Sequence, residues 1–513
     1  MIVSRNFAAG LLRRALLCAS LELAGAGGLW TQAPHERLDL EVLARIRRHG
    51  FERSQVGELA AYLTDVIGPR VMGSSNMRRA NAWTAERLRA WGLANVAVEP
   101  WGFFGRGWEE VGYTGRVLEP FVQPLNARPL AWSGSTAGTV VGPAVILASM
   151  DTSEIRRERG RLADAFVLWR EPPTQPSQSS ATRRRWSEVE LEDSVLHPTP
   201  VQPPSPEQIE TVARNDRRIH AVMRALEAAR IGAILLPSPR PFGLLLVEQT
   251  PGFRRVRDSL DVKPVPALLV GQEQYAVIWR NVRRGIPVRL EVDVKTRLSS
   301  DDTHGYNTLA ELPGSDLAHQ RVMIGGHLDS YSSGTGATDN AAGVAVVMEA
   351  MRILKALSLT PRRTIRVGLW SSEEPGPDGS LGWVNKHADE LARISAYLNV
   401  DTGTGRIRGI TDQGNAAVIP IFTQIFAPLR DLGVVAVQHG WQGGSDQIRF
   451  DFAGVPGFAF IQDPIDYNAS PGTHHTDADT FDHLLIDDLK QAAVVVAWTA
   501  YSLAMRDAML PRK

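Results

Sequence analysis

The sequence predicts an α/β protein whose main sheet is mixed, largely parallel and flanked by helices. From about Asn307 onward, apolar strands alternate with helical segments. The expected strands cover residues 321–326, 364–370, 396–400 and 455–461. Between the first two strands, one helix face carries Val344, Val347, Met348, Met351 and Leu354. Strands separated by helices favour parallel pairing with helices on both faces of the sheet.

The composition is that of an ordinary globular protein and excludes several classes of function. Of the 513 residues, 43% are hydrophobic and 22% are charged, and a chain of this length suggests roughly three domains. The 56 Lys and Arg residues balance the 56 Asp and Glu residues, which gives no electrostatic case for a nucleic-acid partner. Cys18 is the single cysteine, so any metal chemistry must use His, Asp and Glu.

Residues 1–33 have the pattern of a secretory signal peptide and leader. Arg5, Arg13 and Arg14 precede the apolar residues 15–21, and small residues follow at 24–26. We therefore expect a secreted or periplasmic protein, with a frayed amphipathic N-terminal helix as the alternative. No uncharged apolar run reaches the roughly 18 residues that a membrane span needs, so we expect no span. The apolar residues 492–503 are expected to form a buried terminal helix.

The middle of the chain differs in composition from both ends. After helical periodicity between about His35 and Leu93, residues 115–150 are rich in Gly, Pro and Val, which is typical of short strands and turns. Residues 172–206 contain eight prolines and a run of three arginines offset by nearby acids, which indicates a solvated loop that need not pack. A helix at about 208–230 and strands at 232–236, 265–270 and 288–294 follow. The Ala-x-x-Gly-Ala helix end and the Val-Pro-Ala-x-x-Val strand resemble a protease-associated domain, a β-rich module inserted into several exopeptidases.

Residues of the types that bind metals follow successive strands. His327 and Asp329 follow the first strand, Glu373 and Glu374 the second, and Asp401 the third. In an open α/β sheet, ligands bind beyond the carboxyl ends of the strands, so we expect these side chains to converge. Asp339 begins the helix after His327, where it could also be a helix cap, and a His474-His475 pair lies near the C-terminus.

Each of these residues has an ordinary structural explanation when taken alone, but together they favour a two-metal zinc site. Such a site needs a bridging carboxylate and a second carboxylate that takes a proton from water. Glu373 and Glu374 are adjacent at a strand end and point differently, so one can bind metal while the other faces the substrate. Asp329 is placed to hold the second ring nitrogen of His327. The chain lacks a Walker lysine, H-E-x-x-H and G-x-S-x-G, which disfavours a phosphate loop, a zincin and a serine hydrolase.

The combined motifs resemble metallopeptidase family 28, the co-catalytic zinc aminopeptidases. They are Gly-Gly-His-Leu-Asp-Ser at 325–330, Gly-Ala-Thr-Asp-Asn at 336–340, Glu-Glu-x-Gly at 373–376, Asp401, and His-Thr-x-x-Asp-Thr at 475–480. The resemblance runs from about residue 50 to the C-terminus, interrupted mainly at 172–206. It implies the zinc exopeptidase fold and two zinc ions per chain.

The resemblance also implies a role for each matched residue. His327 and Asp401 would hold one zinc ion, and Glu374 and His475 the other. Asp339 would bridge the two ions. Glu373 would be the general base and then the acid for the leaving amine, and Asp329 would orient His327. Spacing to Asp479-Thr480 selects His475 rather than His474 as the ligand.

These inferences give a domain layout and a predicted activity. Residues 34–119 and 298–513 would form the catalytic domain, and residues 120–297 would form the inserted protease-associated-like domain. The predicted activity is hydrolysis of dipeptides or unblocked short peptides. The alternatives are an inactive receptor or binding ectodomain of the same fold, and a glutaminyl cyclase-type enzyme. The sequence does not indicate a side-chain preference, and it leaves the oligomeric state open, with a homodimer as one alternative.

Overall fold

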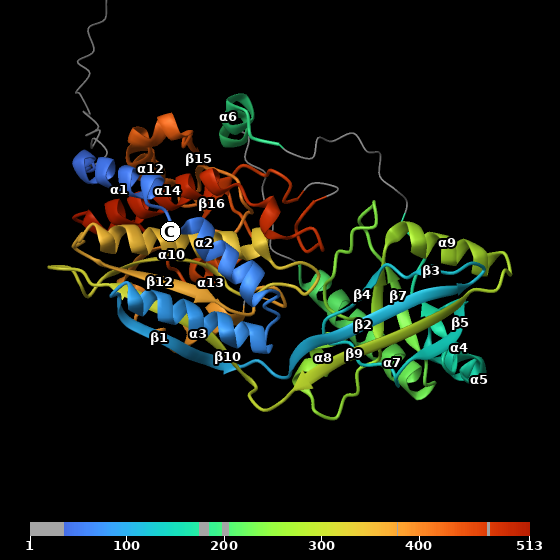
Figure 1. Cartoon of the computed structure of the whole chain (residues 1–513). Coiled ribbons are helices and arrows are strands. Elements are labelled where there is room, and N and C mark those ends of the chain that lie inside the picture. Colours follow the sequence, from blue (N-terminus) through green and yellow to red (C-terminus); the bar gives the residue numbers. More distant parts are fainter. Residues whose placement is uncertain (1–34, 174–183, 197–204, 377, 469–471) are drawn as a thin grey trace, which may run out of the picture. The chain divides into compact units, whose positions relative to one another are not determined.

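The computed structural model describes residues 35–173, 184–196, 205–376, 378–468 and 472–513. One compact unit, Glu36–Lys513, contains two eight-stranded sheets, which Figure 1 shows with their helices. The expected leader at residues 1–33 lies outside the described residues. Among the residues that the structure describes, every helix is too short or too polar to cross a lipid bilayer.

The first sheet is mixed, with a parallel centre. Its strands, in spatial order, are β1 (Ala94–Phe103), β10 (His304–Leu312), β12 (Thr364–Trp370), β11 (Arg321–His327), β13 (Ile394–Asn399), β16 (Gly457–Gln462), β14 (Ile407–Thr411) and β15 (Ala436–Gln438). The four strands β12, β11, β13 and β16 are parallel to one another, whereas β1 and β10 add an antiparallel edge. The predicted fold class is confirmed.

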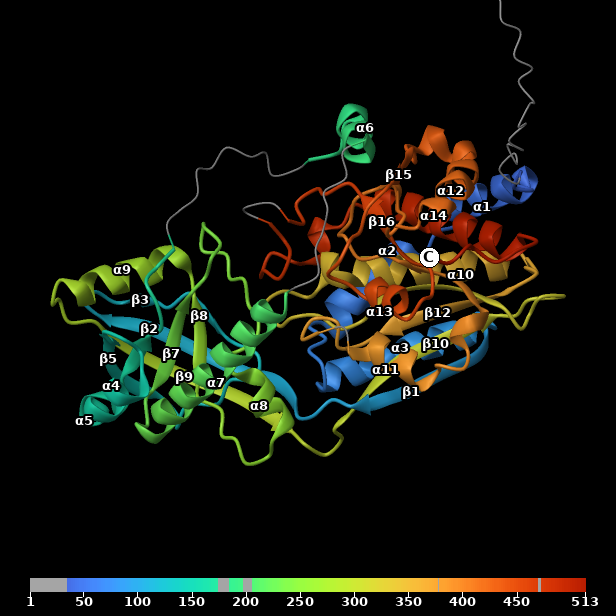
Figure 2. The ribbon, with the colours of Figure 1, turned by 180° about the vertical axis from the view of Figure 1, so that it is seen from behind.

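Helices cover both faces of this sheet because its central strands are apolar on both sides. Val322 and Ile324 of β11 pack into one buried cluster, whereas Met323 between them packs into another, as the two-residue period of a strand requires. The first cluster includes residues of α1 (Leu40–Glu52), α2 (Val56–Ala61), α3 (Ser75–Ala90), α10 (Ala342–Ala356), α12 (Ile419–Phe426) and α14 (Ile486–Met505). The second includes residues of α11 (Asp378–Lys386) and α13 (Gln447–Phe452), which Figure 2 shows from behind.

The second sheet has its own core and its own helices. Its strands, in spatial order, are β3 (Gln123–Pro124), β2 (Gly107–Glu119), β9 (Arg289–Ser299), β5 (Val140–Ile146), β6 (Phe166–Leu168), β7 (Ala233–Pro237), β8 (Ala267–Val270) and β4 (Ala127–Pro129). The accompanying helices are α4 (Thr152–Arg157), α5 (Arg159–Leu162), α7 (Pro206–Ala228), α8 (Phe253–Asp258) and α9 (Gln272–Arg283). Two clusters of buried apolar side chains lie within this region.

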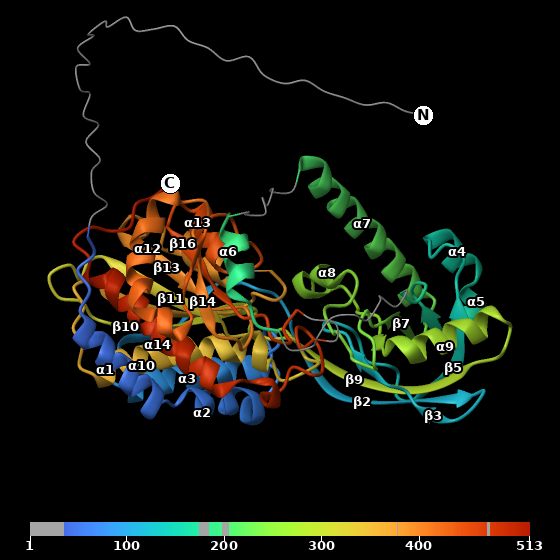
Figure 3. The same ribbon diagram turned by 90° about the horizontal axis from the view of Figure 1, so that it is seen from above.

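The second sheet begins earlier in the chain than the domain boundary placed at residue 120. β2 pairs antiparallel with β9 from Gly107 opposite Ser299 to Glu119 opposite Arg289, and Figure 3 shows the two strands side by side. This long ladder hydrogen-bonds residues 107–119 to the second sheet. The change from one sheet to the other therefore occurs between β1 and β2, at residues 104–106.

The expectation that residues 172–206 need not pack is wrong for residues 184–196. The indole Nε1 of Trp186 donates a hydrogen bond to the carbonyl of Gln462, and Arg185 forms an ion pair with the buried Asp463. The chain then forms α6 (Glu188–Leu196), which lies beside β15 (Figure 1). Trp186 and Arg185 therefore hold this segment against the first-sheet region, which the proline-rich composition did not predict.

Candidate metal centre and active site

Three neighbouring strands bring the predicted site residues to one edge of the first sheet. In the parallel register, His327 of β11 lies opposite Trp370 of β12, and Gly325 lies opposite Asn399 of β13. β12 therefore ends opposite His327, and β13 ends opposite Gly325, two residues earlier in β11. The chain continues to Glu373 and Glu374 after β12, and to Asp401 after β13.

Asp339 is the centre of the cluster because each of its carboxylate oxygens faces a different histidine. Its Oδ1 lies 3.0 Å from Nε2 of His327, which is also 3.1 Å from Oδ1 of Asp401. Its Oδ2 lies 3.1 Å from Nε2 of His475, which is also 3.0 Å from Oε2 of Glu374. The arrangement consists of two half-sites, His327 with Asp401 and His475 with Glu374, that share one carboxylate.

His474 lies close to the same cluster, although the sequence motif favours His475. Its Nε2 is 3.4 Å from Oδ2 of Asp339, and its ring stacks on that of His475 with the centroids 3.7 Å apart. The structure thus groups Asp339 with both histidines as metal-type donors. His475 is the one for which a contact with Glu374 is found among the described residues.

The pKa values of these carboxyl groups shift in opposite directions: that of Asp339 is lowered, and those of Glu373 and Glu374 are raised. Burial opposes ionisation of Asp339, but hydrogen bonds from His327 and His475 hold its pKa well below the usual range. Burial raises the pKa of Glu374 to about 8, and the nearby charge of Asp339 adds to the shift. Burial also raises the pKa of Glu373 well above its ordinary value. Closely spaced carboxylates of this kind are costly unless protons or cations neutralise them.

The donor set fits a pair of divalent metal ions of the zinc type. It offers carboxylate oxygens and imidazole nitrogens without any thiolate, which suits zinc as a borderline metal. The Oε1 atom of Glu374 is buried and has no hydrogen-bond partner among the described residues. A buried carboxylate oxygen without a proton donor is costly in a protein, and a bound cation would remove that cost.

Comparison with known proteins identifies the family. The model of peptidase family M28 matches residues 307–500, the segment that carries the whole cluster. The segment 307–500 is therefore that of an M28 peptidase. Carboxypeptidase Q of Mus musculus is 27% identical over 480 residues, covering 93% of this chain and 90% of that protein. Carboxypeptidase Q of Homo sapiens is 26% identical over 482 residues, with 93% and 89% covered.

Solved structures agree with the family and with the fold. A peptidase M28 precursor from Shewanella amazonensis SB2B matches with a TM-score of 0.67 and 25% identity, covering 92% of this chain and 98% of that chain. BSAP, a zinc aminopeptidase from Bacillus subtilis, matches with a TM-score of 0.56 and 18% identity, covering 88% and 95%. The chain is a metallo-exopeptidase whose residues 307–500 match family M28.

The side chain of Asp339 contacts two histidines, whereas that of the next residue, Asn340, binds the first turn of α10. Oδ1 of Asn340 accepts the backbone N–H of Gly343 at 3.0 Å. Asn340 also donates from Nδ2 to the carbonyl of Val400, which precedes Asp401. These two hydrogen bonds of Asn340 fix the start of α10 against the end of β13. Both carboxylate oxygens of Asp339 face the histidines.

Two buried groups shape the loops of the site in ways that sequence reasoning did not predict. The guanidinium of Arg70 donates to the carbonyls of Leu328, Thr335 and Gly336, which fixes the loop between β11 and Asp339. The carboxylate of Asp479 accepts the backbone N–H groups of Thr338 and Asp339 at 2.6 and 3.2 Å. Asp479 belongs to the recognised motif, but a single buried arginine more than 250 residues away leaves no pattern in the sequence.

A cavity of about 520 Å³ opens onto the cluster. Its lining includes Glu373 and Glu374 on one side and His474 and His475 on another. The lining also includes Tyr467, Asn468, Arg449 and the segment 442–445. Glu373 and the metal-type donors therefore face space in which a substrate can be held.

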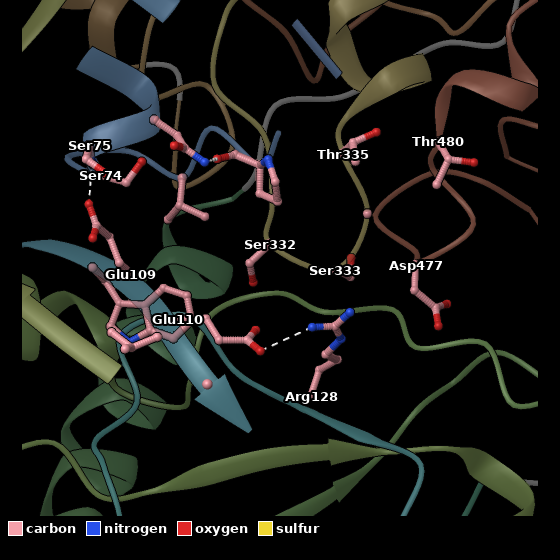
Figure 4. Close-up of a pocket in the computed structure, with 17 residues that line it drawn as sticks. Ser74, Ser75, Glu109, Glu110, Arg128, Ser332, Ser333, Thr335, Asp477 and Thr480 are labelled. Carbon is pink, nitrogen blue, oxygen red and sulfur yellow. Dashed lines mark hydrogen bonds and ion pairs between the residues drawn. The ribbon is translucent and has the colours of Figure 1, made fainter. Parts of the chain in front are cut away.

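A second cavity, of about 580 Å³, is lined in part by the loop after β11 (Figure 4). Ser332, Ser333 and Thr335 line it, and an ion pair between Glu110 and Arg128 crosses it at 3.1 Å. None of its lining residues belongs to the groups of metal-type donors found in the described part of the chain. The chemistry of the M28 cluster therefore points to the first cavity.

Proposed function

We propose that this protein is a two-zinc exopeptidase that hydrolyses dipeptides or short peptides with an unblocked N-terminus. The observation that carries the proposal is the bridging position of Asp339, with one carboxylate oxygen on each half-site. A carboxylate shared by two histidine half-sites is the arrangement that a pair of metal ions requires.

In this proposal, His327 and Asp401 hold one zinc ion, Glu374 and His475 hold the other, and Asp339 binds both. Two zinc ions held there would polarise the scissile carbonyl and lower the pKa of a water molecule toward neutrality. Asp329 orients the ring of His327, because the backbone carbonyl of Asp329 lies 3.1 Å from Nδ1 of that ring. That contact leaves Nε2 of His327 for the metal.

Glu373 is the proposed general base and acid. Its side chain is half-buried, lines the cavity and has a raised pKa, so it can take a proton from water and return it to the leaving amine. The backbone N–H of Glu373 is held by Oδ1 of Asp329 at 3.1 Å, which fixes where its side chain begins. The neighbouring Glu374 contacts His475 instead, so the two glutamates have different surroundings.

The preference for short substrates rests on the cavity and on the relatives. A space of about 520 Å³ is in the range of small-ligand sites rather than of extended grooves. The relatives found are named carboxypeptidase Q and aminopeptidase. We also propose that the region 120–297 limits substrate length, because its residues Leu245–Gln249 contact the site. Internal cleavage of long unfolded polypeptides as fast as dipeptides would rule this out.

A panel of dipeptides with free and acetylated N-termini, with and without zinc, tests the activity. Zinc-dependent cleavage of the free forms alone supports the proposal. Cleavage of neither form supports an inactive ectodomain. Cyclisation of an N-terminal Gln to a pyroglutamyl residue that stays on the peptide, with release of ammonia and with one zinc ion bound, supports a cyclase. The intact double half-site favours the peptidase over both alternatives.

We propose in addition that the protein is exported, on the basis of the signal-like residues 1–33. N-terminal sequencing of the native protein tests this expectation. Protein that lacks the leader and is found in an extracytoplasmic fraction supports the expectation. Protein that begins at Met1 and is found in the cytoplasm contradicts it.

A further inference from the structure

A segment that leads away from the second sheet is hydrogen-bonded to the backbone of the His475 half-site. The segment, Leu245–Gln249, follows β7 in the chain. Leu246 forms an antiparallel bridge with Thr476, and the backbone N–H of Val247 donates to the carbonyl of His475 at 3.0 Å. On its other side, Gln249 forms a parallel bridge with Ala131. The segment is therefore held between residues of the second-sheet region and the loop that carries His475.

Glu248 of this segment faces the ring nitrogen of His475 that points away from the metal-type donors. Its Oε1 lies 3.5 Å from Nδ1 of His475, while Nε2 of the same ring is 3.0 Å from Glu374 and 3.1 Å from Asp339. An acceptor on Nδ1 keeps the proton on that nitrogen and leaves Nε2 as the metal-binding atom.

The other histidine of the cluster has the same arrangement with a different acceptor. Nδ1 of His327 lies 3.1 Å from the carbonyl of Asp329, two residues further along the chain, and its Nε2 faces Asp339 and Asp401. For His475, the acceptor found among the described residues is Glu248, which comes from 227 residues away. The two half-sites therefore differ in which part of the chain orients the histidine.

Gln249 extends the contact to the other ligand-type residue of the same half-site. Its Nε2 donates to the hydroxyl of Tyr331 at 2.7 Å and to the carbonyl of Glu374 at 3.2 Å. The Tyr331 hydroxyl donates to the same carbonyl at 2.9 Å, and its ring packs edge-on against the ring of His475. The backbone of Glu374 and the ring of His475 are thus held by one connected set of side chains.

We propose that Glu248 is a positioning residue that orients His475, so that Leu245–Gln249 sets the affinity of one half-site for its metal and leaves the other unaffected. This inference rests on the proposed two-metal function. It adds that residues outside the M28 segment complete the His475–Glu374 half-site, whereas strands of the first sheet supply the His327–Asp401 half-site.

Zinc retention against chelators of graded strength tests the proposal, with zinc per chain measured by elemental analysis. Glu248→Ala and Glu248→Gln are expected to weaken one zinc ion about 10–100-fold, the range for loss of an outer partner of a metal ligand. At an intermediate chelator strength they should keep one ion where the unaltered protein keeps two. Excess zinc should restore turnover of a dipeptide, because the change lies in affinity and not in the reacting groups.

Controls separate this inference from a folding defect and from the proposed function. Glu227→Gln, on the exposed face of α7, should behave as the unaltered protein. The Glu248 side chain is 51% exposed, so the metal-free variants should melt at the temperature of the metal-free parent. If Glu374→Ala loses one zinc ion while both Glu248 variants keep two at every chelator strength, Glu248 does not position His475. If Glu374→Ala also keeps two, the two-metal assignment itself is wrong.

Discussion

The carboxylate of Asp329 accepts the backbone N–H of Glu373 through Oδ1 at 3.1 Å, and that of Glu374 through Oδ2 at 3.3 Å. Its own carbonyl lies 3.1 Å from Nδ1 of His327, closer than its carboxylate at 3.6 Å. The shorter of the two contacts with His327 is therefore made by the backbone of Asp329. The carboxylate instead holds the two glutamates that follow the neighbouring strand.

Replacing Asp329 by Asn should lower both turnover and zinc affinity. The amide keeps one oxygen acceptor, but its NH₂ group would face a backbone N–H that it cannot bind, so one glutamate loses its fixed position. We expect kcat/KM for a dipeptide to fall about 10–100-fold. Asp482→Asn is the matched control, because Asp482 is exposed. Equal activity of the two variants would show that these N–H contacts do not position the site.

Gly343 allows α10 to approach the end of β13 closely. A Cβ atom at this position would lie 2.2 Å from the carbonyl of Val400 and 2.3 Å from Oδ1 of Asn340. Gly343→Ala should therefore lower the free energy of unfolding by about 1–3 kcal/mol, the usual cost of overpacking. Activity should fall as well, since Val400 and Asn340 adjoin Asp401 and Asp339. Urea unfolding and dipeptide turnover measure the two effects.

Gly160→Ala provides the control for that substitution, because a Cβ atom there would meet nothing within 4 Å. Alanine also restricts the unfolded chain, so this variant should be neutral or slightly more stable. If the Gly343 and Gly160 variants unfolded at the same urea concentration, close helix–strand contact would not explain the glycine at 343.

The sequence could predict the strands that carry the cluster because each is a continuous apolar run followed by polar residues. The expected strand 364–370 has the bounds of β12, and 321–326 ends one residue before β11 does. The antiparallel direction of β10 was not predicted, because it is set by pairing with β1, about 200 residues earlier. Local periodicity contains no information on such pairing.

The same limit applies to the site. His327, Glu374 and His475 could be singled out by residue type and motif, but the acceptor for Nδ1 of His475 could not. Glu248 is an ordinary acid within a short apolar stretch, and only the folded chain brings it to the site. Trp186 was likewise assigned to a solvated loop. Its hydrogen-bond partner, Gln462, lies 276 residues away, so the local sequence does not reveal the contact.

Asp446 should make the stability of the metal-free protein fall as the pH rises. Burial raises the pKa of this carboxyl to about 7 from an ordinary value of 3.8, and a hydrogen bond from Ser380 offsets only part of the shift. Between these two values the folded chain binds a proton that the unfolded chain has lost. The free energy of unfolding from this group therefore decreases from about pH 4 to about pH 7.

Asp446→Asn should remove that part of the pH dependence. In the presence of a chelator, urea midpoints of the variant and the parent should differ more in favour of the variant at pH 8 than at pH 5. The comparison uses the change with pH, so any fixed cost of the amide cancels. Parallel curves for the two proteins would show that Asp446 ionises as freely in the folded state as in the unfolded chain.

The adjacent glutamates should respond differently to substitution. Glu373→Gln removes the proposed proton acceptor but no ion pair with a histidine of the described residues, so the variant should keep two zinc ions per chain while turnover falls. Loss of a general acid–base group costs about 10²–10⁴-fold in rate. Glu374→Ala removes a group that lies 3.0 Å from His475, so it should lose or weaken one zinc ion.

Stability should separate the same two variants, since bound metal stabilises the folded state by mass action. In excess zinc, Glu373→Gln should melt close to the parent, whereas Glu374→Ala should melt lower, and chelation should remove most of the difference. Elemental analysis, melting curves and dipeptide turnover on each variant give three independent readings. Equal zinc loss in both variants, or full activity in Glu373→Gln, would mean that the base and the metal ligand are assigned to the wrong glutamates.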